Sequence, residues 1–376
     1  MKKRKQVITG LALSMLCLLS ACQSASLSKS VAGQSQTTNE SNSKMKTNKS
    51  TLSASYYPAA LSDGKYPLSE SRGMLASRTT QANIENLERG LYELMKNTYS
   101  SEQYTLREGT LLSEDTLSKW LKPKSEENPE GLNPEASNAK ERNQFKPRPL
   151  NSILEYNLLQ KDNDQYQLKA ITIALAMNCE DTFRSDGKEE KVAISREDAL
   201  QSGKNLAEEV VKRIRQQEEY KKVPVQIALF YNRKSDSRAG GNFMAESVAN
   251  AGNSLGNWVD YNRQSIVYGV DTPPKEEDNA SFTRFRSEIE SFFPQLSGLV
   301  GVGLYDNKRL IGIDFTINVP FAGYTENIAL VQHTIASLEA IYPKDLQMSI
   351  KVKSAGHLAA TISRGAGQGQ FQYVVY

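Results

Sequence analysis

The strongest signal for the fold is the segment Ile153–Met177, ILEYNLLQKDNDQYQLKAITIALAM. It contains two apolar, strand-like runs, Ile153–Leu159 and Tyr166–Met177, separated by the polar cluster Lys161-Asp162-Asn163-Asp164. Asp and Asn favour turns because their short side chains hydrogen-bond to the nearby backbone. Two strands joined by such a turn predict a β-hairpin.

A helix and a third strand are predicted directly after the hairpin. Ser195 opens the sequence Ser-Arg-Glu-Asp, which is typical of a capped helix start, and apolar residues then recur at helical spacing as far as Ile214. The apolar run Val225–Phe230 follows. A strand, a helix and a strand in succession predict a mixed sheet with helices packed on one face.

Two amphipathic helices are predicted before the hairpin. Residues Thr80–Tyr99 carry apolar side chains at helical spacing with charges between them. A shorter helix is capped by Ser113 and stopped by Pro123. The stretch Lys122–Pro149 is rich in Pro, Asn, Glu and Lys, which indicates a long exposed loop.

A second unit is predicted in the C-terminal part. Residues Ser235–Asn257 are rich in Gly, Asn, Ala and Ser and lack a strong hydrophobic period, which favours a boundary or a surface loop. A strand near Trp258–Val270 follows, and then the polar segment Asp271–Asn279. The remaining expected elements are the helix Ser281–Phe293, the strands Leu299–Tyr305 and Leu310–Ile317, the helix Thr325–Ile341, and the strands Leu346–Val352 and Phe371–Val375. No clear sequence repeat relates the two units.

These patterns predict an α+β protein. We expect two mixed α/β units with largely antiparallel sheets covered by helices, after a disordered N-terminal tether. The expected segments are 1–21 for an export signal, 22–52 for a Ser/Thr/Asn-rich tether, 53–235 for the first unit, 236–280 for a Gly/Asn-rich connection and strand, and 281–376 for the second unit.

The N-terminus has the layout of a bacterial lipoprotein signal. The basic cluster Lys2–Lys5 precedes the uncharged run Val7–Ala21, which is shorter than the roughly 20 residues that a membrane-spanning helix needs. Leu19-Ser20-Ala21-Cys22 matches the lipobox, in which a leucine and two small residues precede a cysteine. We expect cleavage between Ala21 and Cys22, and transfer of a diacylglyceryl group to the sulfur of Cys22.

Processing of this signal defines the expected partners and location. The two steps require prolipoprotein diacylglyceryl transferase and signal peptidase II. The product would be held on the extracellular face of the cell membrane by its lipid, and a tether of about 30 polar residues would keep the folded part on the order of 30 Å from the surface.

Composition argues against several classes of function. The 46 Lys and Arg residues nearly balance the 43 Asp and Glu residues, and no basic face is interleaved with aromatics, so no nucleic-acid partner is expected. Cys17 leaves with the signal and Cys22 is lipidated, so Cys179 is left as a single thiol, expected to be partly buried. With two histidines, His333 and His357, and no paired ligand spacing, we expect neither a metal site nor a cofactor.

No catalytic residues are predicted, and the protein is not expected to be an enzyme. Gly301-Val302-Gly303 lacks the third glycine of a dinucleotide-binding loop and fits a strand better. The pairs Glu189-Glu190 and Glu208-Glu209 fit solvated surfaces in helices or loops. The segment Arg238–Phe243 has the glycine content of a binding loop, although a flexible connection is the simpler interpretation.

Several segments together resemble one known family. The lipobox is followed by Tyr56-Tyr57-Pro58, Ser71-Arg72-Gly73, Asn83–Leu91 (NIENLERGL) and Arg107-Glu108-Gly109. With the Gly/Asn-rich centre and the C-terminal unit, they make the chain similar over most of its length to the CamS-type sex-pheromone lipoproteins of Gram-positive bacteria.

The resemblance implies two products. In that family the released signal is trimmed to a short hydrophobic pheromone that ends just before the lipidated cysteine. The resemblance implies that the corresponding peptide in this chain is Met15-Leu16-Cys17-Leu18-Leu19-Ser20-Ala21. Cys17 departs from the pattern expected in the family. The resemblance implies no activity for the mature domain, which is expected to bind an unknown surface ligand. The alternatives are a substrate-binding lipoprotein for a peptide or cell-wall fragment, and an envelope hydrolase.

Overall fold

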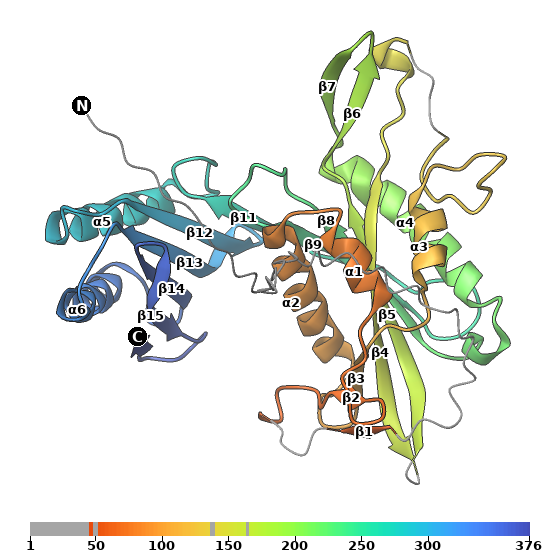
Figure 1. Ribbon diagram of the computed structural model, residues 1–376, viewed down its shortest axis with the longest axis horizontal. Helices are drawn as coiled ribbons and strands as arrows, with labels where there is room; N and C mark the ends of the chain where they lie inside the picture. Colours follow the sequence, from red (N-terminus) through yellow and green to blue (C-terminus); the bar gives the residue numbers. More distant parts are fainter. Residues whose placement is uncertain (1–44, 48–51, 136–139, 163–164) are drawn as a thin grey trace, which may run out of the picture. The chain divides into compact units, whose positions relative to one another are not determined.

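The computed structural model describes residues 45–47, 52–135, 140–162 and 165–376 (Figure 1). The expected signal, the lipobox with Cys22, the heptapeptide Met15–Ala21 and most of the tether lie outside the described residues, as do Asn163 and Asp164 of the predicted turn. Within the described part, no helix combines the length and the apolar character that a membrane span requires.

The predicted hairpin forms the centre of a six-stranded sheet (Figure 1). The strand order is β10-β9-β8-β5-β4-β3, and every neighbouring pair is antiparallel except β5 and β8. The parallel pair needs a crossover connection, which α4 (Arg196–Ile214) supplies. The strands are β3 (Thr105–Glu108), β4 (Leu150–Asp162), β5 (Gln165–Met177), β8 (Val225–Tyr231), β9 (Asn242–Ala249) and β10 (Val259–Asp260).

Helices cover both faces of this sheet, which corrects the expectation of helices on one face. α3 (Glu114–Leu121) and α4 pack on one face, and α1 (Glu70–Ala76) and α2 (Gln81–Thr98) pack on the other. On β5, Ile and Leu side chains at 171, 173 and 175 join the core with α3 and α4, whereas alanines at 170, 174 and 176 join the core with α1 and α2. Because both faces are buried over residues 170–177, this part of β5 is a nearly continuous apolar run.

A second six-stranded sheet follows in the C-terminal part. Its strands are ordered as in the sequence, and only β13 and β14 are parallel. α6 (Tyr324–Ile341) makes that crossover, and α5 (Glu276–Phe292) shares its core cluster. The strands are β11 (Arg263–Val267), β12 (Gly298–Asp306), β13 (Arg309–Val319), β14 (Gln347–Ser354), β15 (His357–Arg364) and β16 (Gln372–Val375).

The two sheets repeat one topology, although the sequence showed no clear repeat. The order β3-α3-β4-β5-α4-β8-β9-β10 corresponds element for element to β11-α5-β12-β13-α6-β14-β15-β16, with the parallel pair at the same place. The first copy carries one insertion, a hairpin of β6 (Glu180–Ser185) and β7 (Lys188–Ala193) between β5 and α4. The expected fold class of two mixed, largely antiparallel sheets covered by helices is confirmed.

Three strands correct the sequence-based expectations. β9 lies inside the segment that was expected to be a loop or boundary, and it pairs with both β8 and β10. β15 was not expected; it follows a tight turn in which Ala355 and Gly356 have φ of 48° and 81°. Glu189 and Glu190 lie in β7, not in a helix or loop. All three strands are rich in small or charged residues, so their pairing depends on neighbours and not on local hydrophobicity.

Most other boundaries agree closely with the expected ranges. The strand expected near Trp258–Val270 is instead two strands in different sheets, β10 and β11, because its two halves pair with different neighbours. α1, β3 and β6 were not predicted. α5 starts at Glu276, five residues before the expected Ser281. Its first turn is Glu276-Glu277-Asp278, where acidic side chains complement the helix dipole. The remaining elements are the pair β1 (Lys46–Thr47) and β2 (Ala60–Leu61) and the short 3-10 helices Arg142–Gln144 and Glu218–Tyr220.

Candidate functional site

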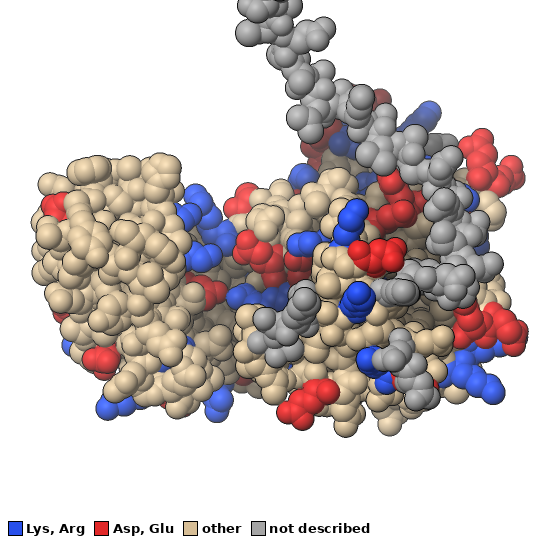
Figure 2. Space-filling view, turned by 60° about the horizontal axis from the view of Figure 1, so that its bottom comes forward, with Lys and Arg blue, Asp and Glu red and all other residues tan. Residues whose placement is uncertain are grey.

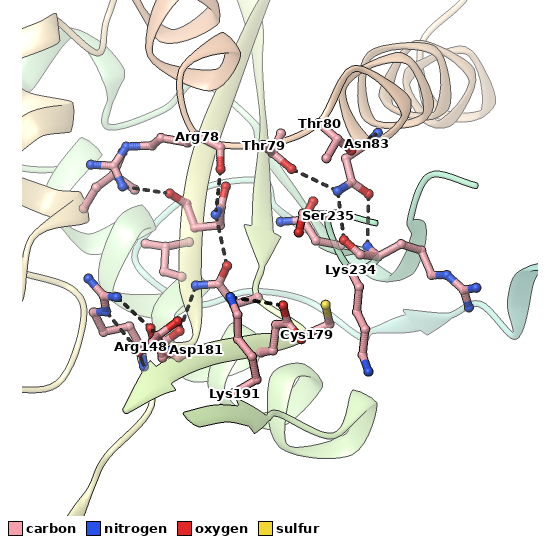
Figure 3. A pocket seen from close by; sticks show the side chains of 18 of the residues that line it. Arg78, Thr79, Thr80, Asn83, Arg148, Cys179, Asp181, Lys191, Lys234 and Ser235 are labelled. Carbon is pink, nitrogen blue, oxygen red and sulfur yellow. Dashed lines mark hydrogen bonds and ion pairs between the residues drawn. The ribbon is translucent and has the colours of Figure 1, made fainter. Parts of the chain in front are cut away.

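A pocket of about 400 Å³ opens at the carboxyl ends of the parallel strands β5 and β8 (Figure 3). Residues 178–182 follow β5, and residues 232–235 follow β8. The rest of the wall comes from the loop between α1 and α2, the first turn of α2, the end of α3, the segment before β4 with Asn133 and Arg148, the start of β4 and the β6–β7 hairpin. Sheets of this kind bind ligands outside the carboxyl ends of parallel strands, because the loops converge there.

Nearly all the side chains that line this pocket are polar. Basic side chains outnumber acidic ones by five to two. Leu121 and Leu150 are the large apolar residues in the described wall. The lining therefore favours a hydrophilic ligand with negative charge. The basic residues are Arg78, Arg148, Lys191, Arg233 and Lys234, and the acidic ones are Glu180 and Asp181.

The face drawn in Figure 2 shows no comparable excess of basic groups. On the face drawn in Figure 2, Lys and Arg side chains are intermixed with Asp and Glu side chains. A mixed surface produces no extended field of one sign, so a charged ligand would be attracted locally.

Asp181 fixes the guanidinium of Arg148 in the pocket wall. Arg148 donates from Nε to Oδ2 at 3.0 Å and from Nη2 to Oδ1 at 2.6 Å, and its backbone N–H donates to Oδ2 at 2.9 Å. Burial by itself raises the pKa of Asp181, but these hydrogen bonds and the charge of Arg148 outweigh it and hold the pKa below its usual value. Asp181 is thus ionised at neutral pH, and Arg148 keeps further N–H groups for another acceptor.

Arg78 lies near Arg148 and has no carboxylate partner among the residues that the structure describes. Its Nη1 donates to the backbone carbonyl of Asn151 at 3.3 Å. Arg78 is exposed, but the partial desolvation of its guanidinium lowers its pKa, and the positive charge of Arg148 lowers it further. Two guanidinium groups close enough to repel each other form a site that an anion would stabilise.

Two buried asparagines in the wall have structural partners. Asn83 is 2% exposed and bonds through both amide atoms to the segment after β8. Asn133 donates to the carbonyls of Leu121 and Leu150 at 2.9 and 3.0 Å, and accepts from the Leu150 N–H at 2.9 Å. These amides hold the pocket together and are not free to bind a ligand.

Asn232 differs from these asparagines. It is 4% exposed and lines the pocket, yet neither its Oδ1 nor its Nδ2 has a hydrogen-bond partner in the described part of the chain. Oδ1 of Asn151, another lining residue, is also buried without a partner. Buried polar atoms are nearly always paired, so a water molecule or a ligand in the pocket is the expected partner of these amides.

Of the residues weighed for chemistry in the sequence, Cys179 lies in this pocket. It is a free, partly buried cysteine, as expected, and burial raises the pKa of its thiol, so the thiolate is disfavoured at neutral pH. His333 stacks on Phe292 with ring centroids 4.1 Å apart, and His357 begins β15. Across the described ranges, no group of three or more His, Cys, Asp and Glu side chains is arranged to hold a metal ion.

The glycine segments are packed, not flexible. A Cβ on Gly240 would lie 2.0 Å from the carbonyl oxygen of Ala82 in α2, and Phe243 is 2% exposed. The interpretation of Arg238–Phe243 as a flexible connection is therefore wrong, because the segment is fastened to α2. Gly301 lies in β12, where a Cβ would meet the ring of Phe282 at 2.8 Å, so the strand interpretation is confirmed.

The basic and amide residues of the pocket were missed in the sequence. One signal was present: Arg233-Lys234 follows directly after the apolar run Val225–Tyr231, where a strand–helix–strand unit ends. Polar residues at the carboxyl end of a parallel strand are the usual place to look for a site in such a unit. Arg78 and Arg148 had no comparable signal, because both precede a structural element in polar loops.

The comparisons with known proteins agree with the resemblance seen in the sequence. The family model described as "CamS sex pheromone cAM373 precursor" matches residues 66–370. A solved sex pheromone precursor from Lactobacillus salivarius subsp. salivarius UCC118 is 30% identical, with a TM-score of 0.82 over 88% of this chain and 99% of that chain. No curated protein matches the chain.

A second solved structure shares the fold at lower identity. It is the C-terminal domain of the sex pheromone staph-cAM373 precursor from Staphylococcus aureus, which is 22% identical with a TM-score of 0.66, over 79% of this chain and 97% of that chain. Since the family model covers most of the sequence and the solved Lactobacillus precursor is similar over nearly its full length, the chain belongs to the CamS family of sex pheromone precursors.

Proposed function

We propose that this pheromone precursor is a lipid-anchored surface protein that gives rise to two functional products. One is the heptapeptide Met15–Ala21, released from the signal, and the other is the folded part, which acts as a ligand-binding module. Membership of the pheromone-precursor family supports the first product. The polar pocket, with its buried and unpartnered Asn232 amide, supports the second.

The anchor is a diacylglyceryl group on Cys22. Each buried methylene contributes about 0.8 kcal/mol, so two acyl chains hold a protein durably where one holds it marginally. The test is a Cys22→Ala variant in the producing cell, followed by labelling with radioactive palmitate. The variant should lose the label and keep its uncleaved signal, while a Cys179→Ala control keeps the label and is cleaved. Label retained on Cys22→Ala would contradict the anchor.

The pheromone activity belongs to the uncharged peptide Met15–Ala21. Its apolar side chains suit passage through a membrane and capture by an apolar receptor pocket. A synthetic peptide should induce plasmid transfer or clumping in a responder strain at low concentration, and a peptide of the same composition in scrambled order should not. Silence of the native peptide at every concentration would refute this product.

The folded part binds a hydrophilic ligand in the pocket at the ends of β5 and β8. The observation that carries this assignment is Asn232, an amide buried in the wall of a polar pocket with both of its polar atoms unpartnered among the described residues. The same lining argues against capture of the protein's own apolar heptapeptide. The test is a thermal-shift screen of hydrophilic small molecules, in which a hit should be lost in Asn232→Leu. A hit unaffected by Asn232→Leu would place binding elsewhere.

We also propose that the folded part is not an enzyme. Burial keeps the Cys179 sulfur protonated, and Asp181 is engaged by Arg148, so neither is set up as a nucleophile or a general base. An envelope hydrolase is the competing hypothesis. Incubation of the protein with purified cell-wall polymers and peptides should release no product, and turnover that Asp181→Asn or Cys179→Ala abolishes would establish the hydrolase instead.

A further inference from the structure

We propose that the pocket at the ends of β5 and β8 recognises a phosphate monoester on a small hydroxyl-bearing molecule, with Arg78 and Arg148 contacting the phosphate. The inference rests on the proposed binding function and adds the chemical class of the ligand. Three observations support it. Basic residues outnumber acidic ones in the pocket, the two arginines have N–H donors that make no hydrogen bond in the described structure, and two amide side chains in the wall have polar atoms with no partner there.

The charge balance points to a dianion. Three of the five basic residues of the pocket have acidic partners: Arg148 with Asp181, Lys191 with Glu180 at 3.5 Å, and Arg233 with Asp271 at 2.7 Å. Arg78 and Lys234 have no ion-pair partner among the described residues. A phosphate monoester carries about −1.5 to −2 at pH 7, which matches the net positive charge of the pocket as a whole better than the single charge of a carboxylate. Arg78 is the uncompensated cation on the side of Arg148, and Lys234 adds its charge from the other side of the pocket.

The arginines are prepared to bind several oxygens. A guanidinium has five N–H donors, and the described structure gives the Arg78 side chain one hydrogen bond, to the carbonyl of Asn151. Arg148 uses Nε and Nη2 on Asp181 and keeps the rest. Because Asp181 already holds Arg148 in place, binding an anion there loses little side-chain entropy. Two forked donors suit the tetrahedral oxygens of phosphate.

Amide side chains hydrogen-bond to the rest of the ligand. Figure 3 places Arg78 and Arg148 on one side of the pocket and Lys234 and Ser235 on the other, with Cys179 between them. Asn232 offers one unpartnered donor and one unpartnered acceptor, and Asn151 offers an acceptor. Hydroxyl groups satisfy both kinds of partner. A volume of about 400 Å³ suits a molecule of the size of a phosphorylated polyol or sugar.

The second copy of the repeated topology serves as an internal comparison. The chain after β13 reads Pro320-Phe321-Ala322-Gly323, and the turn after β14 is Ala355-Gly356. Neither carries a charged side chain. The basic pocket therefore does not follow from the topology; it is specific to the first copy, which also carries the inserted β6–β7 hairpin that contributes Asp181 and Lys191.

The experiment is isothermal titration of the full chain at pH 7.5 with glycerol 3-phosphate, inorganic phosphate, succinate and glycerol. Glycerol 3-phosphate should bind, inorganic phosphate should bind more weakly, and glycerol should not bind. Arg78→Gln should weaken glycerol 3-phosphate by about tenfold or more, because it removes charge-assisted hydrogen bonds, and Arg78→Lys should recover part of the loss. The matched control Arg284→Gln removes an exposed arginine of α5 and should change nothing.

Other results overturn the proposal in distinguishable ways. Equal binding of succinate, or binding of glycerol 3-phosphate that is unchanged in Arg78→Gln, would reject phosphate recognition by these arginines. A screening hit that is neutral and lost in Asn232→Leu would reject the phosphate class and leave the binding module standing. Absence of binding by every probe, together with an empty screen, would remove both. Far-UV circular dichroism and thermal unfolding of each variant exclude misfolding as the cause.

Discussion

Asn83 and Arg233 are joined by a reciprocal pair of hydrogen bonds across 150 residues of sequence. Asn83 Nδ2 donates to the Arg233 carbonyl oxygen, and Asn83 Oδ1 accepts from the Arg233 N–H, both at 3.0 Å. The same Oδ1 accepts from the Gly241 N–H at 2.9 Å, and Nδ2 also donates to Thr79 Oγ1 at 2.9 Å. One amide therefore fastens the first turn of α2 to the chain between β8 and β9, and so fixes one wall of the pocket.

This arrangement predicts a contrast between two buried asparagines. Asn83→Ala removes an amide with four partners and should lower the free energy of unfolding by about 3 kcal/mol, because buried donors and acceptors lose their bonds. Asn232→Ala removes an amide whose polar atoms have no partner in the described chain, and should change it by less than about 1 kcal/mol. Urea unfolding followed by tryptophan fluorescence measures both.

The contrast separates a structural asparagine from a functional one. If Asn232→Ala proved as damaging as Asn83→Ala, Asn232 would have a structural role and the binding assignment would lose its main support. If Asn232→Ala left stability intact and removed ligand binding, the amide would be one of the positions where a protein keeps an unsatisfied polar group for function.

Alanine substitutions at Gly240 and Gly73 should have opposite effects on stability, because the space available for an added Cβ differs between the two positions. A Cβ on Gly240 would approach the Ala82 carbonyl oxygen to 2.0 Å, and backbone cannot move aside cheaply. Gly73 lies inside α1 with nothing within 4 Å of the added Cβ. Gly240→Ala should therefore destabilise by about 2 kcal/mol or more, while Gly73→Ala should stabilise by about 0.5–1 kcal/mol through its helix propensity.

Thermal unfolding of the two alanine variants checks this contrast. A fall in the unfolding temperature for Gly240→Ala and a small rise for Gly73→Ala are expected. Equal, small effects at both positions would mean that the segment after β8 is loosely held, as the interpretation of Arg238–Phe243 as a flexible connection implied.

Local chemistry made part of the fold predictable from the sequence. Each of three predicted helices begins at a residue whose side chain caps it. Thr80, Ser113 and Ser195 accept a hydrogen bond from the backbone N–H three residues later, at 3.3, 3.2 and 3.0 Å. The hairpin of β4 and β5 was likewise recognisable, because its strands are long and apolar and its turn is polar. Each of these signals lies within a few residues of the structure that it predicts.

The remaining features depend on contacts between distant segments. β9 and β15 are strands because neighbours pair with them on both sides, and no local period shows that. The pocket is assembled from separate loops, and in the sequence Arg78, Arg148 and Asn232 are ordinary polar loop residues. What makes Asn232 notable is the absence of a partner among the described residues, which can be seen only once the chain is folded.

The lowered pKa of Asp181 predicts how the stability of the protein depends on pH below neutrality. Its pKa is lowered in the folded state, so its contribution is present above the unfolded value, near 4, and is lost as the pH falls through the lower folded value. Asp181→Asn should therefore be less stable than the wild type at pH 6, and the difference should shrink steadily below pH 4. Thermal unfolding between pH 3 and pH 7 measures it.

The control for this effect is Asp115→Asn, which removes the exposed partner of Lys119 on α3. Because both side chains are exposed and solvent screens their charges, little change is expected at any pH. A difference between the wild type and Asp181→Asn that stays constant from pH 3 to pH 7 would show that Asp181 acts through packing and not through its charge.

The raised pKa of Glu155 predicts the opposite dependence of stability on pH, with a contribution that falls as the pH rises. Its side chain is fully buried in β4, where Oε1 accepts from the Leu111 N–H at 3.1 Å and Oε2 accepts from the Leu112 N–H at 2.8 Å. Burial raises the pKa of this carboxyl, and the hydrogen bonds from the two backbone groups oppose the rise without cancelling it. The folded state thus holds the proton more tightly than the unfolded state, whose value is near 4.3.

A raised pKa contributes stability that is complete below the unfolded value and is lost as the pH rises through the folded value. Glu155→Gln cannot ionise, but it keeps a carbonyl acceptor for one of the two N–H groups. The variant should therefore be less stable than the wild type at pH 4 and should gain on it as the pH rises toward 8. Urea unfolding at intervals of one pH unit measures the difference, with the exposed Glu102→Gln as a control. A gap that is independent of pH would show that Glu155 has the same protonation equilibrium folded and unfolded, which its complete burial argues against.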